Sequence, residues 1–370
     1  MIKSKQPAKI GSYKREDVVF LLKDLSSIQL EDSLEKREKK VQAGGHYSES
    51  LPIEYQPPKK YMDLFWQSLD QYKQKVALNI GIVAEQIVHQ KGANTVLVSL
   101  ARAGTPIGIL MKRYIQFRFG FNIPHYSISI IRDRGIDENA IRYILSMHPN
   151  HRIQFVDGWT GKGAISLELT KACRTFEEKY AISLDDTLAV LADPGHCTTL
   201  FGTREDFLIP SACLNSTVSG LVSRTVLNKE YIGENDFHGA KYYRELAEMD
   251  VSNQYIDLIS DEFPFISDQV KKTVGERLLE GLQADFIGMR EVERLQKEFD
   301  LTNSHLIKPG VGETTRVLLR RVPWKVLIRD LESPYVKHVL LLAQEKKVKV
   351  EHQPNLGYLC CGLIKPMEGA

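Results

Sequence analysis

Arg152-Ile-Gln-Phe-Val-Asp-Gly-Trp-Thr-Gly-Lys-Gly-Ala-Ile165 is the stretch of sequence that decides the fold. Its mostly apolar first half predicts a strand, and residues 165–179 predict a helix. The turn between them is rich in small residues, so backbone N–H groups can converge there, and the N-terminus of the helix adds partial positive charge. This pattern is typical of a phosphate-binding turn in an α/β protein, although a plain tight connection between strand and helix gives the same pattern.

Further segments repeat the pattern along the chain. Apolar runs at residues 95–100, 126–131 and 187–191 predict strands, and residues 107–119 predict a helix after the first of them. Strands that alternate with helices favour a mainly parallel sheet with helices on both faces. The sequence therefore predicts an α/β fold.

Other segments are expected to be helical. Ser12 is suited to cap a helix at residues 17–22, and the mixed charges of residues 31–40 indicate a solvated helix face. Apolar residues recur at helical spacing over residues 62–89. Residues 241–282 also predict helix, with a break at the proline.

The chain divides into three parts on this pattern. Residues 1–285 are expected to form the sheet domain with a leader and a hood, and residues 286–305 a helical connector. Residues 306–370 predict a second, compact α/β unit. This last part is basic: residues 308–370 contain 11 Lys/Arg against 6 Asp/Glu, whereas the whole chain has a formal net charge of only +2.

The five cysteines are an odd number without a C-x-x-C pair, which argues against a disulfide framework or a structural zinc site. No apolar run approaches the roughly 18 residues that span a bilayer. Residues 1–10 lack the apolar core of a secretory signal. We therefore expect a cytoplasmic protein without membrane association.

Three side chains or turns at strand ends suggest a common ligand. The turn around Gly161 is suited to a monophosphate, and Asp157 to a diol such as that of ribose. Arg102, in the turn after residues 95–100, is suited to a second anionic group. A sugar with phosphate at one end and pyrophosphate at the other would satisfy all three.

The segment Asp157-Gly-Trp-Thr-Gly-Lys-Gly163 resembles the phosphoribosyl-diphosphate loop of type I phosphoribosyltransferases. Ser99-Leu-Ala-Arg-Ala-Gly-Thr-Pro-Ile-Gly108 resembles their pyrophosphate loop. The resemblance implies a type I phosphoribosyltransferase-like sheet domain with extra helices. Where that family usually has two consecutive acids, this chain has Asp157 followed by Gly158, so diol recognition would rest on one carboxylate.

The resemblance also implies roles for individual residues. Asp157, Arg102 and Lys162 would be catalytic, with Asp157 as a ligand of Mg²⁺. Phosphoribosyl diphosphate would be the co-substrate, and a nucleobase-like compound the acceptor. The co-substrate would contact Ala103, Gly104, Gly158, Thr160, Gly161, Gly163 and Ala164.

Several segments together resemble one bacterial family, labelled either "phosphoribosyltransferase with a Pelota RNA-binding domain" or "cysteine protease StiP family" and associated with tellurium-resistance and stress gene clusters. They are Gly11-Ser-Tyr, His46-Tyr-Ser-Glu49, Leu100-Ala-Arg-Ala-Gly-Thr-Pro106, Val156-Asp-Gly-Trp-Thr-Gly-Lys-Gly163 and Ala192-Asp-Pro-Gly-His-Cys197. The second label makes a cysteine protease the alternative. Its nucleophile would be Cys197 or Cys213, with a base drawn from His46, His151 or His238, because neighbouring residues of an extended chain point to opposite sides.

Lys308-Pro-Gly-Val-Gly-Glu-Thr-Thr-Arg316 resembles a segment of Pelota and of ribosomal proteins that bind kinked RNA. The asparagine that reads a base there is Gly312 in this chain. RNA contact through Lys308, Arg316, Arg320, Arg321 and Lys325 is therefore expected to be general rather than sequence-specific.

Three hypotheses result. The first is a phosphoribosyltransferase that makes a nucleoside-like metabolite in a tellurite-resistance or stress pathway. The second is a cysteine protease. The third is a non-catalytic RNA-binding regulator whose sheet domain senses a ribose phosphate. The sequence leaves open whether the chain is a homodimer.

Overall fold

The computed structural model describes residues 7–33, 36, 44–301 and 303–364. Its centre is a parallel six-stranded sheet in the order β1-β6-β5-β9-β10-β11. The strands are β1 (Val19–Phe20), β6 (His125–Ile128), β5 (Thr95–Leu100), β9 (Arg152–Trp159), β10 (Ala189–Ala192) and β11 (Leu200–Thr203).

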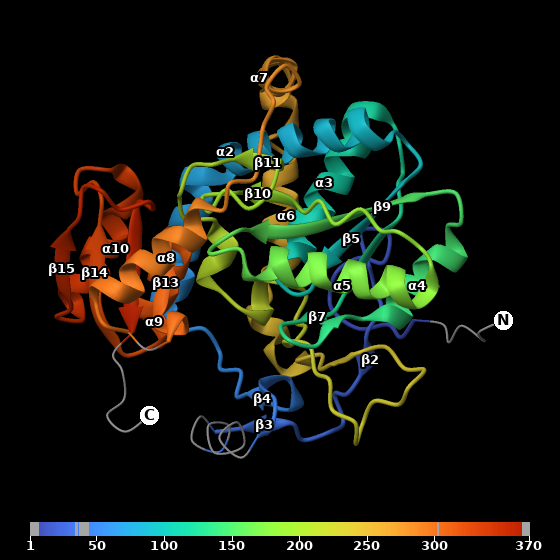
Figure 1. Ribbon diagram of the computed structural model, residues 1–370, viewed down its shortest axis with the longest axis horizontal. Helices are drawn as coiled ribbons and strands as arrows, with labels where there is room; N and C mark the ends of the chain where they lie inside the picture. The colour runs from blue at the N-terminus through green and yellow to red at the C-terminus, as the bar shows by residue number, and fades with distance from the viewer. Residues whose placement is uncertain (1–6, 34–35, 37–43, 302, 365–370) are drawn as a thin grey trace.

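Helices cover both faces of this sheet (Figure 1). One layer contains α2 (Lys59–Lys91), α3 (Gly104–Phe119), α6 (Ser252–Ser260) and α7 (Phe263–Arg277), and the other contains α4 (Glu138–Met147) and α5 (Ala164–Tyr180). Strand β5 is buried on both sides, as a central parallel strand should be. Its Leu97 belongs to the core under α2 and α3, and Val96 and Val98 belong to the core under α4 and α5.

A second, smaller domain follows helix α8 (Ile287–Glu298). Its four-stranded mixed sheet has the order β13-β16-β14-β15 and carries helices α9 (Val311–Arg320) and α10 (Lys337–Glu345). The strands are β13 (Ile307–Pro309), β16 (Cys360–Ile364), β14 (Pro323–Ile328) and β15 (Lys349–His352). The predicted α/β fold, with a parallel sheet and a small C-terminal domain, is confirmed. The narrower assignment to a phosphoribosyltransferase-like sheet and the three domain boundaries stay predictions.

The two domains share one hydrophobic core. Val311, Leu318 and Leu319 of α9 belong to the same buried cluster as the residues of α2. In Figure 1 the small domain lies at one side of the large sheet, with α8 and α9 toward it. Asp206 fastens the contact, because its carboxylate accepts hydrogen bonds from the backbone N–H groups of Val311 (2.7 Å) and Leu359 (3.1 Å).

One local prediction is wrong, a second is wrong at its first two residues and lies mostly outside the described residues, and a third holds in part. Residues 17–22 contain strand β1 instead of a helix capped by Ser12, because the backbone of this β-branched and aromatic run pairs with β6. Glu31–Asp32 is strand β3, and most of the remaining residues up to 40 lie outside the described residues. The region 241–282 is helical only over α6 and α7 and a 3₁₀ segment, Arg244–Met249.

Among the described residues, no helix is long and apolar enough to cross a membrane.

Candidate functional site

The turns after β5, β9 and β10 meet at the carboxyl edge of the sheet. A Cβ on Gly104 would lie 2.5 Å from the carbonyl oxygen of Val156, so the first two turns are in contact. A Cβ on Gly195 would lie 1.9 Å from the carbonyl oxygen of Gly161, so the third turn touches the second. Only glycine permits such close backbone approaches. The structure therefore brings the turns of Arg102, Asp157 and Cys197 into one layer.

Asp157 is a half-buried carboxyl group in this layer. The backbone N–H of Gly158 donates to its Oδ1 at 2.7 Å. Burial nevertheless raises the pKa of Asp157 to about 7, because this one hydrogen bond only partly offsets the loss of water around the carboxylate. Asp157 is thus a carboxyl group that titrates near neutral pH. Its predicted role as a Mg²⁺ ligand stays a prediction.

The Gly-rich turn leads into α5. Gly163, at φ +85°, has the left-handed conformation that favours glycine, and it precedes the first residue of the helix. The Nζ of Lys162 donates to the carbonyl oxygen of Ser304 at 2.9 Å. The hydroxyl of Tyr358 donates to the carbonyl oxygen of Gly161 at 3.1 Å. The small domain therefore covers the turn in which the sequence predicts a phosphate cradle.

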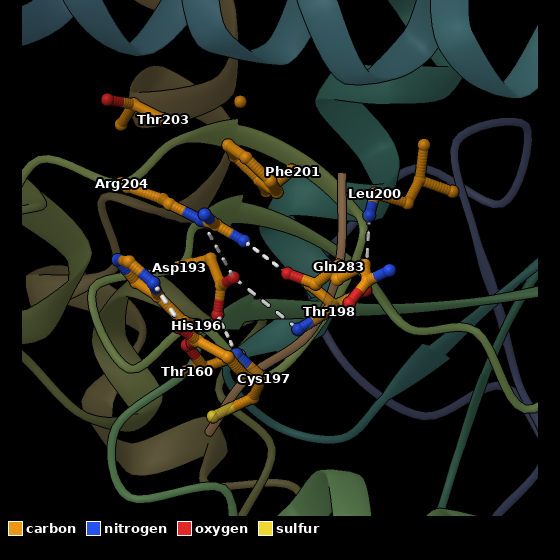
Figure 2. A network of polar contacts seen from close by, with 12 residues as sticks. Thr160, Asp193, His196, Cys197, Thr198, Leu200, Phe201, Thr203, Arg204 and Gln283 are labelled. Atoms are coloured by element: carbon orange, nitrogen blue, oxygen red, sulfur yellow. Dashed lines mark hydrogen bonds and ion pairs between the residues drawn. The ribbon is translucent and has the colours of Figure 1, made fainter. Parts of the chain in front are cut away.

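Asp193, the first residue after β10, organises the third turn (Figure 2). It is fully buried, and its Oδ1 accepts hydrogen bonds from Thr160 Oγ1 (2.5 Å) and the backbone N–H of Cys197 (2.7 Å). Its Oδ2 accepts from the backbone N–H of Thr198 and lies 3.8 Å from Arg204 Nε. Asp193 was not among the residues predicted to have a role, although an acid followed by Pro-Gly at a strand end is a signal of a ligand or anchor position.

Cys197 lies below the Gly-rich turn. It is 5% exposed, and its Sγ is 3.8 Å from the carbonyl oxygen of Gly161. Burial and the nearby Asp193 raise the pKa of the Cys197 thiol to about 12, and a hydrogen bond from Thr160 opposes them. The thiol is therefore neutral in this arrangement.

His196 does not have the extended backbone that the sequence analysis assumed, because its φ is +54°. Its imidazole nevertheless extends away from the thiol of Cys197 in Figure 2. The Nδ1 of His196 lies 3.1 Å from Asp285 Oδ1. The ring also lines a cavity of about 530 Å³ between the two domains, which it shares with Arg204, Asp206, Arg329 and Tyr358, among others.

The other predicted participants in thiol chemistry lie elsewhere. Cys213 is fully buried in the core, where burial raises its pKa to about 12. The Nδ1 atoms of His46 and His238 contact the hydroxyls of Ser48 (2.8 Å) and Ser129 (2.9 Å), and His151 packs on the ring of His148.

The five residues predicted to bind RNA differ in exposure and in the contacts they make. Arg316 and Arg320 of α9 face the large domain, where Arg320 donates to Asn215 Oδ1 (2.5 Å) and to the carbonyl oxygen of Cys213 (2.6 Å). Lys308 is partly buried nearby, and Arg321 is exposed. Lys325 lies on β14 and pairs with Glu351 at 2.9 Å.

Within the described residues, no three His, Cys, Asp or Glu side chains gather in a way that would hold a metal ion.

Comparison with known proteins identifies the family. Residues 11–260 match the family described as "Tellurite-like stress resistance cysteine protease StiP". A protein of Acinetobacter baylyi named "Cysteine protease StiP" is 37% identical over 350 residues, which cover 92% of this chain and 90% of that protein. The chain belongs to the StiP family. Residues 286–366 match a second family, described as "PELOTA RNA binding domain", which corresponds to the small domain and α8.

The prediction of a phosphoribosyltransferase is wrong. The family and the similar protein are both named for a cysteine protease, which the sequence analysis gave only as the alternative. Neither match supports phosphoribosyl diphosphate or magnesium as part of the activity. The resemblance of two turns was insufficient, because strand-end turns with glycine and arginine occur in many α/β folds.

Proposed function

We propose that this StiP-family chain is a cysteine peptidase and that Cys197 is its nucleophile. The observation that carries the assignment is the position of the thiol at the N-terminus of α5. A Cβ on Gly163, the residue before that helix, would lie 3.2 Å from the Cys197 Sγ. A helix N-terminus favours a thiolate, and cysteines activated in this way are typical nucleophiles.

Two further groups support the proposal. The first backbone N–H groups of α5 have no side-chain cap, so they are available to stabilise an oxyanion. His196 lines the neighbouring cavity, and its pair with Asp285 has the form of a base oriented by a carboxylate. In this proposal a peptide enters the cavity and His196 turns toward the thiol.

The described arrangement corresponds to a resting state in this proposal, since burial keeps the thiol protonated. The segment 286–288 and the small domain form a cover over the turn of Cys197. Two backbone hydrogen bonds hold this cover: Phe286 N–H donates to the carbonyl oxygen of His196 (3.0 Å), and Gly288 N–H donates to the carbonyl oxygen of Gly195 (3.1 Å). The bond from Tyr358 to Gly161 adds a third connection. Activation therefore requires the segment 286–288 and the small domain to move away.

The test uses fluorescently labelled casein as the substrate probe. We expect slow hydrolysis by the wild type and faster hydrolysis by Tyr358→Phe. Cys197→Ala should abolish both activities, because the nucleophile is lost. Cys213→Ala and Cys173→Ser should keep them. Retained hydrolysis in Cys197→Ala, or no hydrolysis by either the wild type or Tyr358→Phe, would overturn the proposal.

We also propose that the small domain binds RNA, on the strength of its match to the PELOTA family and its basic composition. Arg321 is the exposed member of the predicted set, whereas the donors of Arg320 are already engaged by the large domain. Fluorescence anisotropy with a short single-stranded RNA should show binding that weakens with salt and with Arg321→Ala. Absence of binding at 50 mM salt would exclude it.

A further inference from the structure

Three arginines meet between the two domains, and we name them the arginine trio: Arg102, Arg316 and Arg320. Arg102 comes from the turn after β5 of the large domain. Arg316 and Arg320 are four residues apart on α9 and therefore lie on the same face of that helix. Contacts link Arg102 and Arg320: Glu54, which lies 3.7 Å from Arg102, accepts a hydrogen bond from Ser216, and the neighbouring Asn215 accepts one from Arg320. After burial, the main cause, Arg316 lowers the pKa of Arg102, and Arg316 and Arg102 lower the pKa of Arg320.

The chain neutralises this trio only in part. Arg316 Nη1 pairs with Glu313 at 2.9 Å, and Arg102 Nη1 lies 3.7 Å from Glu54 Oε1. That Glu54 oxygen already accepts hydrogen bonds from the backbone N–H of Ser216 (3.0 Å) and from its hydroxyl (2.8 Å). Among the residues that the structure describes, three guanidinium groups therefore share two carboxylates, one of which is engaged elsewhere.

One donor atom of Arg102 has no hydrogen-bond acceptor among the described residues. Its side chain is only 15% exposed, and its Nη1 atom is buried without a hydrogen bond to any described residue. A buried guanidinium donor that is left without an acceptor destabilises the fold. An added acceptor with negative charge would remove this cost.

More positive charge lies beside the trio. Lys308 is influenced by Arg132, Arg316 and Arg321, and Lys162 by Lys308 and Arg132. Burial and these like charges lower the pKa of Lys162 to about 8. Glu313 is the carboxylate that influences both lysines. Among the described residues, cationic side chains therefore outnumber carboxylates in this region, which favours an anion.

We propose that the arginine trio is a binding site for a small phosphate-class oxyanion, held by both domains at once. The planar donors of arginine match two oxygens of a phosphate, and three such groups together suit a dianion or a pyrophosphate. The ligand is small because Arg102 is almost covered and two donors of Arg320 are tied to Asn215 and Cys213. The site assigns binding and no chemical step, and it does not depend on the peptidase proposal.

Binding would also join the domains. Arg102 belongs to the large domain and the two helix arginines to the small one, so an anion between them replaces their mutual repulsion by attraction. The ligand therefore stabilises the arrangement in which the small domain covers the turn of Cys197. The site would sense a phosphorylated metabolite or a free phosphate.

The test measures melting temperature and heat of binding of the full chain with inorganic phosphate and pyrophosphate at constant ionic strength. We expect a rise of about 2 °C or more at a ligand concentration 100-fold above the dissociation constant. Arg316→Gln should weaken binding at least tenfold. Lys349→Gln, which removes one exposed positive charge from the same domain, should not change it.

Glu54→Gln is a variant that should change anion affinity in the opposite direction to Arg316→Gln. The amide keeps an oxygen for Ser216 but removes a negative charge beside Arg102, so anion binding should tighten, an effect that misfolding would not produce. The proposal is overturned if neither anion binds, or if Arg316→Gln and Lys349→Gln behave alike. It is also overturned if a 5′-phosphorylated RNA binds through the trio while both inorganic anions fail, because the source of the phosphate is then a macromolecule.

Discussion

Two regions of the contact between the domains differ in how well the chain satisfies its own charged groups. Around Asp193 every oxygen of a fully buried carboxylate has a donor: Thr160, Cys197 and Thr198. In the arginine trio, three cations share two carboxylates, and Arg102 retains a buried donor without an acceptor among the described residues. The carboxylate of the first region is complete without a ligand, although Arg204 Nε beside it is buried without a hydrogen bond to a described residue, as Arg102 Nη1 is. The balance of charge separates the two regions, because Asp193 faces one guanidinium group and the two carboxylates of the second region face three.

The largest expected effect comes from breaking the complete region. Asp193→Ala would leave the buried N–H groups of Cys197 and Thr198 and the hydroxyl of Thr160 without their acceptor. We expect a loss of about 3 kcal/mol or more in the free energy of unfolding. Chemical denaturation measures it, with Asp186→Ala as a control near the surface. A loss below about 1 kcal/mol would show that Asp193 is not an anchor.

A second, smaller effect concerns the carboxyl group between the two regions. The pKa of Asp157 is raised to about 7, above the value of about 3.9 in an unfolded chain. The unfolded state therefore loses its proton first, and the contribution of Asp157 to stability falls as pH rises from about 4 to 7 and is constant above 7. Asp157→Asn should remove this loss and stabilise the chain at pH 7.5 by roughly 2 kcal/mol.

Denaturation curves at pH 4.5, 6 and 7.5 give the measurement. The advantage of Asp157→Asn over the wild type should grow across this series. An advantage that is equal at all three values would mean that the carboxyl group is already ionised at pH 4.5, and an advantage that shrinks would reverse the sign of the argument. Asp186→Asn, at the surface, serves as the control for the charge change.

The contrast also explains what the sequence could predict. The strands at 95–100 and 152–159 and their turns were predictable, because apolar β-branched runs followed by glycine have a local signature. The turns of Arg102 and Asp157 could be expected at one sheet edge, since parallel strands end together. Strand β1 was not predictable, because two residues become a strand only through pairing with β6.

The proximity of Arg102 to α9 was even harder to predict from the sequence. More than 200 residues separate Arg102 from Arg316, and only the docking of the small domain brings them together. Docking also determines the surroundings of Arg320, which was predicted to contact RNA and which the structure places against Asn215. The cover over Cys197 has the same origin, because Tyr358 is remote in sequence from Gly161.

The smallest expected effect on stability comes from Tyr358, whose hydroxyl contacts the turn of Gly161. Tyr358→Phe removes the hydroxyl that donates to Gly161 and leaves the ring in place, so the free energy of unfolding should fall by only about 1 kcal/mol. The cover over Cys197 should nevertheless open more often, because a difference of about 1 kcal/mol changes an opening equilibrium roughly fivefold.

Iodoacetamide labelling of Cys197, followed by mass spectrometry, measures this opening. Tyr126→Phe is the matched control, since it removes a hydroxyl that contacts His148 within the large domain and takes no part in the contact between the domains. Labelling should rise about fivefold in Tyr358→Phe and remain unchanged in Tyr126→Phe. Pyrophosphate should slow labelling in both if the arginine trio holds the domains together. Equal labelling in the two variants would show that the thiol is reached by a motion in which the small domain has no part.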